Sequence, residues 1–396
     1  MNPIFALDLG TTKFCAAGIF EGPEKELRID LVTTPATGMR RGMLSDLNLV
    51  TKGIEQLLIQ AEHQFNFEVN KVALGIAGSH LRTKTVDYTT PIAESRITSR
   101  TLNQLKQEAK QKFRQGDREI LHLVPTSYQI DHREQILNPI NQTGNSIKAE
   151  FFVIDSDLLY IRDLVTACNR AGLEVGSIYA EPFASSSVTV PRELQNMGIA
   201  IADIGGGTTD GIVFQNGKPK GGFTFNIGGL MMTNDIAIGL NLPMTEAEKA
   251  KTYFGLSGQR TDLSLEFTDL AGSQKVVAGS DVQKILAHRI LEWGEQLADC
   301  LVPFKGQLGS GLLLTGGGSS ILSLAPLLRH QFEIPVQTIS PSLCEVTNQK
   351  QYPGKYATAL GLLYFEYQKY KKSTSHGQRW KIPFFKTVAQ WVQDFS

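Results

Sequence analysis

The feature that most constrains this chain is a pattern that occurs twice, about 195 residues apart. The copies, Ile4–Lys13 and Ile199–Asp210, are each an apolar run that ends in an aspartate, followed by a Gly/Thr turn and a further apolar run. This order predicts a β-hairpin with a tight polar tip. Glycines let a ligand approach the backbone, and turn N–H groups with threonine hydroxyls suit phosphate oxygens. Two such tips predict two similar domains facing each other across a hinged cleft.

A third segment carries related turn chemistry. Leu312–Leu314 predicts a strand, Thr315–Ser320 is the sequence TGGGSS, and Ile321–Arg329 predicts a helix. A strand, a glycine turn and a helix N-terminus in that order can contact an anion or a nucleotide. One glycine turn alone is equally well an ordinary hairpin turn, but the three segments together favour nucleotide binding. The chain contains no GxxxxGK[ST] sequence, which excludes a P-loop enzyme.

Two aspartates and one lysine complete the predicted phosphate site. Asp8 and Asp203 end their strands at the mouth of the cleft, where two carboxylates repel each other unless a cation lies between them. Mg²⁺ suits that position, held largely through its own waters and the phosphates of the nucleotide. Lys13 follows the first turn and can reach a phosphate as a point charge, or can be a solvated lysine at a hairpin tip.

Three further charged residues each allow two interpretations. Glu181 follows a strand and begins a helix, so it either compensates the helix dipole or faces the cleft and orders a water for attack on a phosphate. Glu248 and Lys251 lie three residues apart on one helical face, and Thr245 with Glu248 forms a capping-box pattern. They are either a helix start with an ion pair or a pair that contacts ribose and base.

Composition and element order indicate the fold class. Lys+Arg and Asp+Glu are equal at 39 each, so no overall field favours nucleic acid. Strand and helix patterns alternate in both halves, which indicates a duplicated α/β fold. The stretch 83–155 is polar and differs in composition from its surroundings, so it is predicted to be an inserted module. No segment reaches the roughly 18 to 20 apolar residues of a spanning helix, which leaves at most a surface attachment.

With these motifs in place, the chain resembles the actin-like ATPase superfamily and, within it, the FtsA family of bacterial cell-division proteins. The segments that resemble FtsA most specifically are Pro35–Leu47 (PATGMRRGMLSDL), Gly75–Leu81 (GIAGSHL), Leu121–Asp131 (LHLVPTSYQID) and Ala359–Phe365 (ALGLLYF). The resemblance implies a duplicated actin-like (ribonuclease H-like) fold with two lobes around a nucleotide cleft and an FtsA-type inserted subdomain.

The resemblance also implies a division of the chain into subdomains. The expected parts are 1–82, 156–195 and 346–367 as subdomain 1A, 83–155 as inserted subdomain 1C, 196–244 and 305–345 as subdomain 2A, 245–304 as subdomain 2B, 368–379 as a linker, and 380–396 as an amphipathic membrane-targeting helix.

The same resemblance assigns roles to single residues. ATP is expected as the nucleotide, and slow hydrolysis stays open. The expected nucleotide contacts are Gly10, Thr11, Thr12, Lys13, Gly205, Gly206, Gly207, Thr208, Thr209, Glu248, Lys251, Gly316, Gly317 and Gly318, with Asp8 and Asp203 at Mg²⁺ and Glu181 as a water-positioning residue. Arg289 and Glu292 match the pair that receives the C-terminal tail of the tubulin-like protein FtsZ, or form an ordinary exposed ion pair.

The C-terminal segment predicts a membrane contact. After Tyr367 a short basic stretch has too little apolar surface to fold, and a segment with helical apolar spacing follows. The apolar stripe consists of Trp380, Phe384, Phe385, Val388, Trp391, Val392 and Phe395. With lysines nearby it fits a helix lying flat on an anionic membrane surface. The alternative is a helix that docks on its own domain.

Together these expectations describe an ATP-binding actin-like protein that polymerises and anchors FtsZ filaments to the inner face of the cytoplasmic membrane at the division site. It would recruit later division proteins and would not bind nucleic acid. One alternative is a pilus-assembly scaffold like PilM, which lacks the amphipathic end. The other is a phosphotransferase of the sugar-kinase type, for which the sequence offers no convincing catalytic aspartate in an enclosed substrate pocket.

Overall fold

The structure is a computed structural model that describes residues 1–92, 96–344, 346–347 and 351–375. The predicted membrane-targeting helix at 380–396, with its stripe Trp380, Phe384, Phe385, Val388, Trp391, Val392 and Phe395, lies outside the described residues. The last part of the predicted linker, 376–379, lies outside them as well. Among the described residues, no helix combines the length and the apolar character needed to cross a lipid bilayer.

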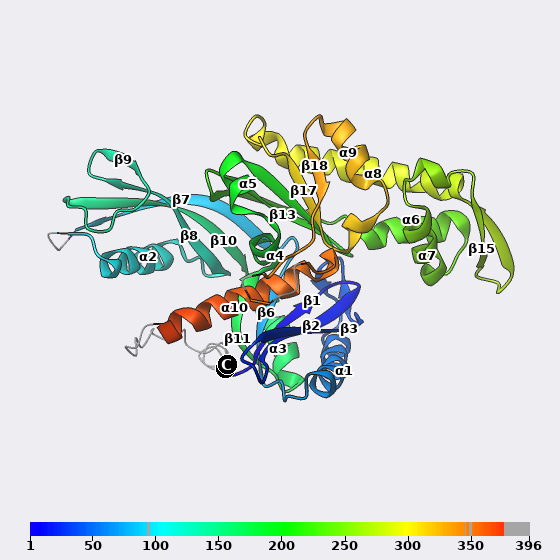
Figure 1. The fold of residues 1–396 in the computed structure, drawn as a ribbon, viewed down its shortest axis with the longest axis horizontal. Helices are drawn as coiled ribbons and strands as arrows, with labels where there is room; N and C mark the ends of the chain where they lie inside the picture. The colour runs from blue at the N-terminus through cyan, green and yellow to red at the C-terminus, as the bar shows by residue number, and fades with distance from the viewer. Residues whose placement is uncertain (93–95, 345, 348–350, 376–396) are drawn as a thin grey trace.

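Two five-stranded sheets of the same topology form the centres of two lobes (Figure 1). The first has the order β11-β6-β1-β2-β3 and the second β14-β13-β12-β17-β18, so that each has a three-strand antiparallel meander extended by two strands parallel to its first strand. This repetition confirms the predicted duplication. The strands are β1 (Ile4–Leu9), β2 (Lys13–Glu21), β3 (Leu27–Pro35), β6 (Lys71–Ile76), β11 (Glu174–Ala180), β12 (Ile199–Ile204), β13 (Thr209–Gln215), β14 (Lys218–Phe225), β17 (Leu312–Thr315) and β18 (Val336–Thr338).

Helices with one buried face cover the first sheet. In α1 (Leu47–Phe65) the Asp46 carboxylate caps the first turn by accepting the N–H groups of Asn48 and Leu49 at 2.9 and 3.0 Å. With α3 (Leu158–Arg170) it packs its apolar stripe into a core shared with β1, β2 and β6. Between β3 and α1 lies a small hairpin of β4 (Met39–Arg40) and β5 (Met43–Leu44).

An inserted module with its own core projects from the first lobe (Figure 1, cyan). Its sheet has the order β7-β10-β8-β9, and α2 (Ser99–Phe113) covers one face. The strands are β7 (Leu81–Pro91), β8 (Arg118–Ile130), β9 (Arg133–Ile136) and β10 (Ser146–Asp157). This separate sheet and core confirm the predicted inserted subdomain.

The second lobe carries a helical extension at the far end of the molecule (Figure 1, green to yellow). It consists of α6 (Gly229–Leu240), α7 (Met244–Phe254), a hairpin of β15 (Ser264–Thr268) and β16 (Gln274–Ala278), and α8 (Gly279–Leu301). The fully buried Trp293 of α8 lies in the core that joins these helices to the second sheet. The short α5 (Arg192–Met197) precedes β12, and α9 (Leu324–Phe332) lies between β17 and β18.

Helices α4 (Glu181–Thr189) and α10 (Ala357–Ser375) pack against each other between the two sheets. Their backbones meet at Gly361, where a Cβ atom would collide with the carbonyl group of Ala184. Helix α10 continues to Ser375, so the prediction of an unfolded linker from residue 368 is wrong for 368–375. Tyr367 is buried, and Lys369 donates to Ser177 Oγ at 2.8 Å. Contacts with the rest of the protein therefore stabilise the helix beyond its apolar residues.

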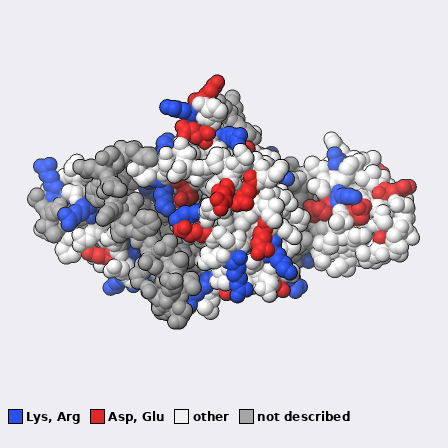
Figure 2. Space-filling model, turned by 90° about the horizontal axis from the view of Figure 1, so that it is seen from below, with Lys and Arg blue, Asp and Glu red and all other residues white. Residues whose placement is uncertain are grey.

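The surface agrees with the balanced composition. In the view of Figure 2, Lys and Arg side chains alternate with Asp and Glu on the part of that face that is not grey. No single-sign field of the kind that attracts nucleic acid dominates this visible area.

Candidate functional site

One cavity of about 880 Å³ brings together the predicted motifs of both lobes. All the predicted nucleotide, metal and water-positioning residues except Thr209 line it: Asp8, Gly10, Thr11, Thr12, Lys13, Glu181, Asp203, Gly205, Gly206, Gly207, Thr208, Glu248, Lys251, Gly316, Gly317 and Gly318. The volume lies in the range of small-molecule and cofactor sites. Segments from five separate parts of the sequence thus face one space.

The tips of the two hairpins touch each other across this cavity. In the second tip, Gly205 N–H donates to Thr208 O at 2.9 Å and closes the turn. A Cβ atom on Gly206 would collide with Thr12, and one on Gly207 would collide with Thr11 Oγ1. Glycine is therefore required where the turns meet, which leaves backbone N–H groups of both lobes accessible from one side.

Thr209 does not belong to the lining. Its side chain is fully buried, donates to Ile227 O at 2.7 Å and accepts the indole N–H of Trp293 at 2.8 Å. The prediction of a direct nucleotide contact at Thr209 is wrong in this structure, because side chains alternate along β13 and the hydroxyl points into the core. Thr209 therefore stabilises the hairpin from its core side.

Three residues that the sequence analysis did not assign to the site also lie at the hairpin tips. Gly42, in the turn between β4 and β5, donates its N–H to Thr11 Oγ1 at 2.9 Å and accepts the Tyr160 hydroxyl at 2.8 Å. Asp210 of β13 accepts the Gly78 N–H at 3.1 Å and the hydroxyls of Thr208 and Thr224. Asp210 is the last residue of the second predicted motif, so the sequence pattern could have indicated it as a site residue. Gly42 and Tyr160 reach the site only through the tertiary fold.

Carboxylates from both lobes lie close together in the cavity. Burial raises the pKa of Asp203 to about 7, with Asp210 and Asp8 adding to the rise while hydrogen bonds from Ser185 and Thr358 oppose it. Burial, followed by the charges of Asp8, Asp210 and Asp203, raises the pKa of Glu181 well above its usual range. Carboxylates crowded into one cavity in this way favour binding of a cation.

Lys13 is not a solvated hairpin lysine. Its Nζ lies 3.2 Å from Asp8 Oδ2, and its side chain is only 24% exposed. Burial by itself would lower the pKa of Lys13, but the carboxylate of Asp8 outweighs this effect and the pKa is raised. The ammonium group therefore stays charged at the floor of the cavity.

No compact metal cage accompanies these carboxylates. Within the described part of the chain, no three His, Cys, Asp or Glu side chains converge closely enough to hold a metal ion. Two carboxylates from opposite lobes in one cavity nevertheless fit Mg²⁺, which retains several waters and takes few protein ligands. The donor set therefore suits an ion bound mostly through water and phosphate.

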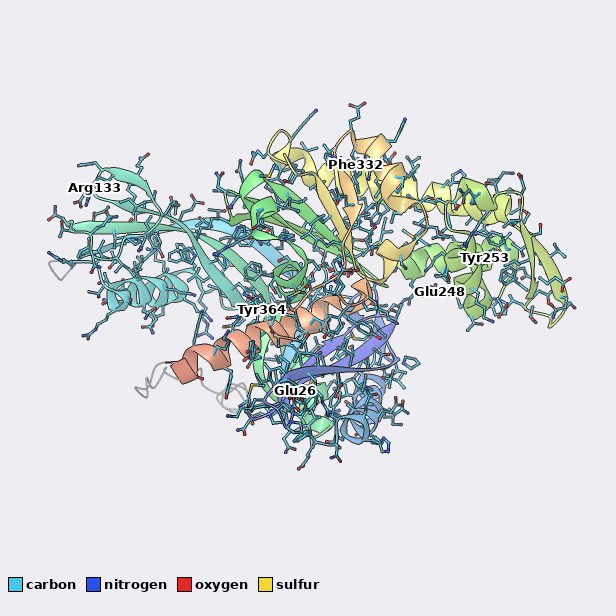
Figure 3. The ribbon with its side chains drawn as sticks, in the orientation of Figure 1. Glu26, Arg133, Glu248, Tyr253, Phe332 and Tyr364 are labelled. Atoms are coloured by element: carbon cyan, nitrogen blue, oxygen red, sulfur yellow. The ribbon has the colours of Figure 1, made fainter. Side chains whose placement is uncertain are left out.

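Glu248 and Lys251 are both an ion pair and part of the lining. Their charged atoms lie 2.7 Å apart, and Lys251 Nζ also donates to Gly229 O at 3.0 Å and Thr233 Oγ1 at 2.8 Å. In the view of Figure 3, Glu248 lies on the side of the second lobe that faces the first-lobe strands. The predicted capping box is wrong, because α7 begins at Met244 after Pro243 and no side chain caps it.

The TGGGSS segment lines the cavity with a turn in place of a helix end. Residues Gly317–Ser320 form a 3₁₀ turn, and α9 begins only at Leu324. The predicted contact through a helix N-terminus is therefore wrong, because Ile321 is extended and Ser323 is left-handed at φ 63°. Gly316 has φ 84°, and a Cβ atom there would collide with Asp203 and Ile204, so this position requires glycine.

Arg289 and Glu292 lie on α8 and are not part of the cavity lining. The two side chains form the predicted ion pair, but Arg289 is also held in a two-point contact by Asp235 of α6, with N–O distances of 2.6 and 3.0 Å. Glu292 stays half exposed. The pair is therefore anchored to α6, in contrast to an isolated exposed ion pair.

Comparison with protein families gives two matches. Residues 200–361 match the family described as "Cell division protein FtsA", and residues 78–155 match "SHS2 domain inserted in FTSA". The second match covers nearly the whole inserted module. Together the two matches include more than half of the chain.

Curated proteins with the same description match almost the entire chain. A cell division protein FtsA of Buchnera aphidicola subsp. Baizongia pistaciae is 27% identical, with 99% of this chain and 97% of the relative covered. That of Escherichia coli strain K12 is 28% identical, with 91% and 90% covered. The similarity thus includes both lobes and the inserted module.

Solved structures share the fold. The PilM–PilN type IV pilus biogenesis complex gives a TM-score of 0.64 at 18% identity, covering 91% of this chain and 98% of the other. MreB5 of Spiroplasma citri bound to ADP gives 0.56 at 15% identity, covering 95% and 99%. These similarities show an actin-like fold.

Proposed function

The chain belongs to the FtsA family of cell-division proteins, and on this premise we propose that it binds Mg²⁺-ATP between its lobes, polymerises, and anchors FtsZ filaments to the inner face of the cytoplasmic membrane. The observation that carries the proposal is the single cavity that collects both hairpin tips, the TGGGSS turn and the Glu248–Lys251 pair. The subdomain boundaries expected from the sequence belong to the same proposal, as does recruitment of later division proteins.

The nucleotide lies, in this proposal, with its phosphates at the hairpin tips. The backbone N–H groups of Gly10–Thr12 and Gly206–Thr208 cradle phosphate oxygens, and Lys13 adds a charge. Gly316–Gly318, Glu248 and Lys251 contact base or ribose. Asp8 and Asp203 hold Mg²⁺ through its waters, and the ion neutralises phosphate charge. Thr209 has no contact role in this assignment.

Glu181 is the candidate for water positioning during ATP hydrolysis. It lines the cavity together with Asp8 and Asp203, and these charges and burial raise its pKa. A carboxyl group with a raised pKa is suited to accept a proton from an attacking water. The alternative of a surface charge that only compensates the helix dipole does not fit a side chain that lines the cavity beside Asp8 and Asp203.

The FtsZ tail is proposed to bind on α8 and α6 near Arg289 and Glu292. Support comes from the family and from the exposed apolar side chains of the same two helices, Ile238 at 74% and Leu291 at 53%. Arg289 is fixed by Asp235, so it offers a rigid partner for a carboxylate, while Glu292, which pairs with Arg289 and is half exposed, can also accept a basic residue of the tail.

We expect Glu292→Lys to weaken binding of an FtsZ tail peptide about tenfold, because it reverses an exposed charge beside the docking surface. The ion pair lost on the protein itself is worth only some tenths of a kcal/mol, so the thermal unfolding midpoint should change little. Fluorescence anisotropy with a labelled tail peptide measures the effect. Glu266→Lys on the exposed β15 is the matched control and should bind like the parent. Equal affinities for both variants and the parent would place the tail elsewhere.

Membrane attachment is assigned to residues 380–396, and polymerisation would strengthen it through avidity. Partial immersion of the apolar stripe, at roughly 1.5 to 3 kcal/mol per fully buried large side chain, together with about 1 kcal/mol per nearby cation, supports a modest affinity for one copy. Location at the division site follows from the proposed FtsZ contact.

Removing residues 377–396 is expected to abolish sedimentation with vesicles that contain anionic lipid. Pelleting of the full chain and the shortened chain, each with and without Mg²⁺-ATP and an FtsZ tail peptide, tests the attachment and the function together. Full-length protein should pellet most strongly with ATP, and the shortened chain should stay in the supernatant while still binding the tail peptide. A shortened chain that pellets as well as its parent would refute the assignment of the tail.

The two alternative functions have less support. The PilM–PilN complex shares the fold at 18% identity, but both family matches and the curated relatives are FtsA proteins. A sugar-kinase-type activity would need an acceptor pocket with a catalytic aspartate beside the phosphates. Of the aspartates that line the cavity, Asp8 and Asp203 are assigned to Mg²⁺ and Asp210 is occupied by three hydrogen-bond donors.

A further inference from the structure

A small aromatic cluster joins the inserted module to both helices between the lobes. We call it the hinge cluster; it consists of His122 from β8, Tyr179 from β11, Phe183 from α4 and Phe365 from α10. The His122 ring packs edge-on against Phe183 with centroids 4.8 Å apart, and Phe365 lies 5.1 to 5.9 Å from the other three rings. Four elements from separate parts of the chain therefore meet in this cluster.

His122 also makes a directed bond to the start of α4. Its Nε2 accepts the Ala180 N–H at 2.9 Å, so the ring carries its proton on Nδ1. Burial, with smaller effects from Lys106 and Lys110, lowers the pKa of His122 to about 3, which keeps the acceptor unprotonated. Ala180 ends the edge strand β11, so its N–H has no sheet partner on that side and depends on the module for one.

Both helices that the cluster touches also reach the candidate nucleotide site. Glu181 is the residue after Ala180 and two before Phe183, and its carboxylate lines the cavity. Seven residues before Phe365, Thr358 of α10 donates to Asp203 Oδ2 at 3.3 Å. The close packing of α4 and α10 at Gly361 leaves little freedom for one helix to move without the other.

From this juxtaposition we infer that His122 is a positioning residue through which the inserted module sets the place of Glu181 in the cleft. The module holds the Ala180 N–H and the Phe183 ring, on the two sides of Glu181 in the chain. A rotation of the module relative to the first sheet therefore moves this carboxylate, and by reciprocity the occupant of the cleft biases the orientation of the module. The inference rests on the proposed binding of Mg²⁺-ATP.

A double-mutant cycle on the full chain tests this coupling, with the Kd for Mg²⁺-ATP measured by calorimetry. H122F keeps an aromatic ring but cannot accept the Ala180 N–H, and E181Q removes the carboxylate charge. We expect H122F to shift the Kd at least about threefold in the parent and by less than about 1.5-fold in the E181Q background. A purely structural role for His122 would give the same factor in both backgrounds.

Matched variants fix the interpretation. H132F makes the same substitution at an exposed histidine of the same module and should leave the Kd unchanged. H122Q restores an acceptor for the Ala180 N–H and should return the Kd to within about twofold of the parent. If H122F does not fold, as thermal unfolding would show, H122L takes its place as the variant without an acceptor.

Two results overturn the inference alone: equal shifts in both backgrounds, or no shift in the parent background. A shift caused equally by H132F would overturn it as well, because the effect would not be specific to the hinge cluster. A parent protein that takes up no Mg²⁺-ATP refutes the proposed function, and the inference falls with it. That outcome is visible before any variant is made, so the two failures are distinguishable.

Discussion

Replacing Asp203 with asparagine is expected to weaken Mg²⁺-ATP binding about 100-fold and, at the same time, to stabilise the nucleotide-free protein. The first effect follows because the substitution removes one of the two carboxylates proposed to organise the ion. The second follows because burial raises the pKa of Asp203 from 3.8 to about 7, so folding the protein with this carboxylate ionised is unfavourable. Calorimetry with ATP and magnesium measures the first effect.

The stabilising effect depends on pH in a defined direction. A carboxyl group with a raised pKa in the folded state destabilises the protein increasingly as the pH rises from its unfolded pKa to its folded pKa. The penalty is small below pH 4 and complete above pH 7, where it is on the order of 4 kcal/mol. The gain in unfolding free energy of Asp203→Asn over the parent should therefore be ~2 to 3 kcal/mol larger at pH 8 than at pH 5.

Denaturant titrations at the two pH values test this dependence. Asp30→Asn on the edge strand β3 is the control, because that carboxylate is outside the cavity and only pairs with Arg28. A gain for Asp203→Asn that is equal at both pH values would show that the carboxylate is not held at a raised pKa. Retention of the parent's Kd would remove Asp203 from the proposed metal site.

Trp293→Ala is expected to lower the free energy of unfolding by ~3 to 5 kcal/mol, the largest loss of stability that we expect from one side chain. Trp293 is fully buried, packs against Phe225 with ring centroids 6.1 Å apart and donates its indole N–H to Thr209 Oγ1 at 2.8 Å. The substitution leaves a cavity behind the second phosphate hairpin and removes a partner of Thr209. Nucleotide affinity should therefore fall together with stability.

Trp293→Phe separates packing from hydrogen bonding. It keeps most of the ring volume and loses the N–H, so a loss of about 1 kcal/mol is expected. Leu270→Ala, at a side chain that is 65% exposed, should stay within about 0.5 kcal/mol of the parent. Denaturant unfolding followed by far-ultraviolet circular dichroism measures all three. A Trp293→Ala protein within 1 kcal/mol of the parent would contradict the packing argument.

Local sequence patterns predict the parts of the fold that depend on local interactions. The two hairpins and the separate module follow from apolar periodicity, turn residues and a change of composition. The end of α10 was not predictable in this way. Residues 368–375 are polar, and their helical state depends on contacts such as that of Lys369 with Ser177, which is 192 positions away in the chain.

The site shows the same division between local and tertiary information. Glycines, threonines and aspartates in repeated motifs indicate the parts of the cavity lining at the hairpin tips, because tight turns that approach a ligand need those residue types locally. Thr209 was assigned wrongly because the motif does not reveal which side of β13 faces the core. Gly42 and Tyr160 carried no signal, since only the folding of distant segments brings them to the hairpin tips.

Helix α10 has a mechanical consequence. Its 19 residues span about 28 Å at 1.5 Å per residue, from the floor of the cleft near Thr358 to Ser375. Because the helix is stiff, a tilt of about 10° about its cleft end displaces Ser375 by about 5 Å. Small angular changes at the cleft therefore become displacements of several ångströms at the far end of this helix.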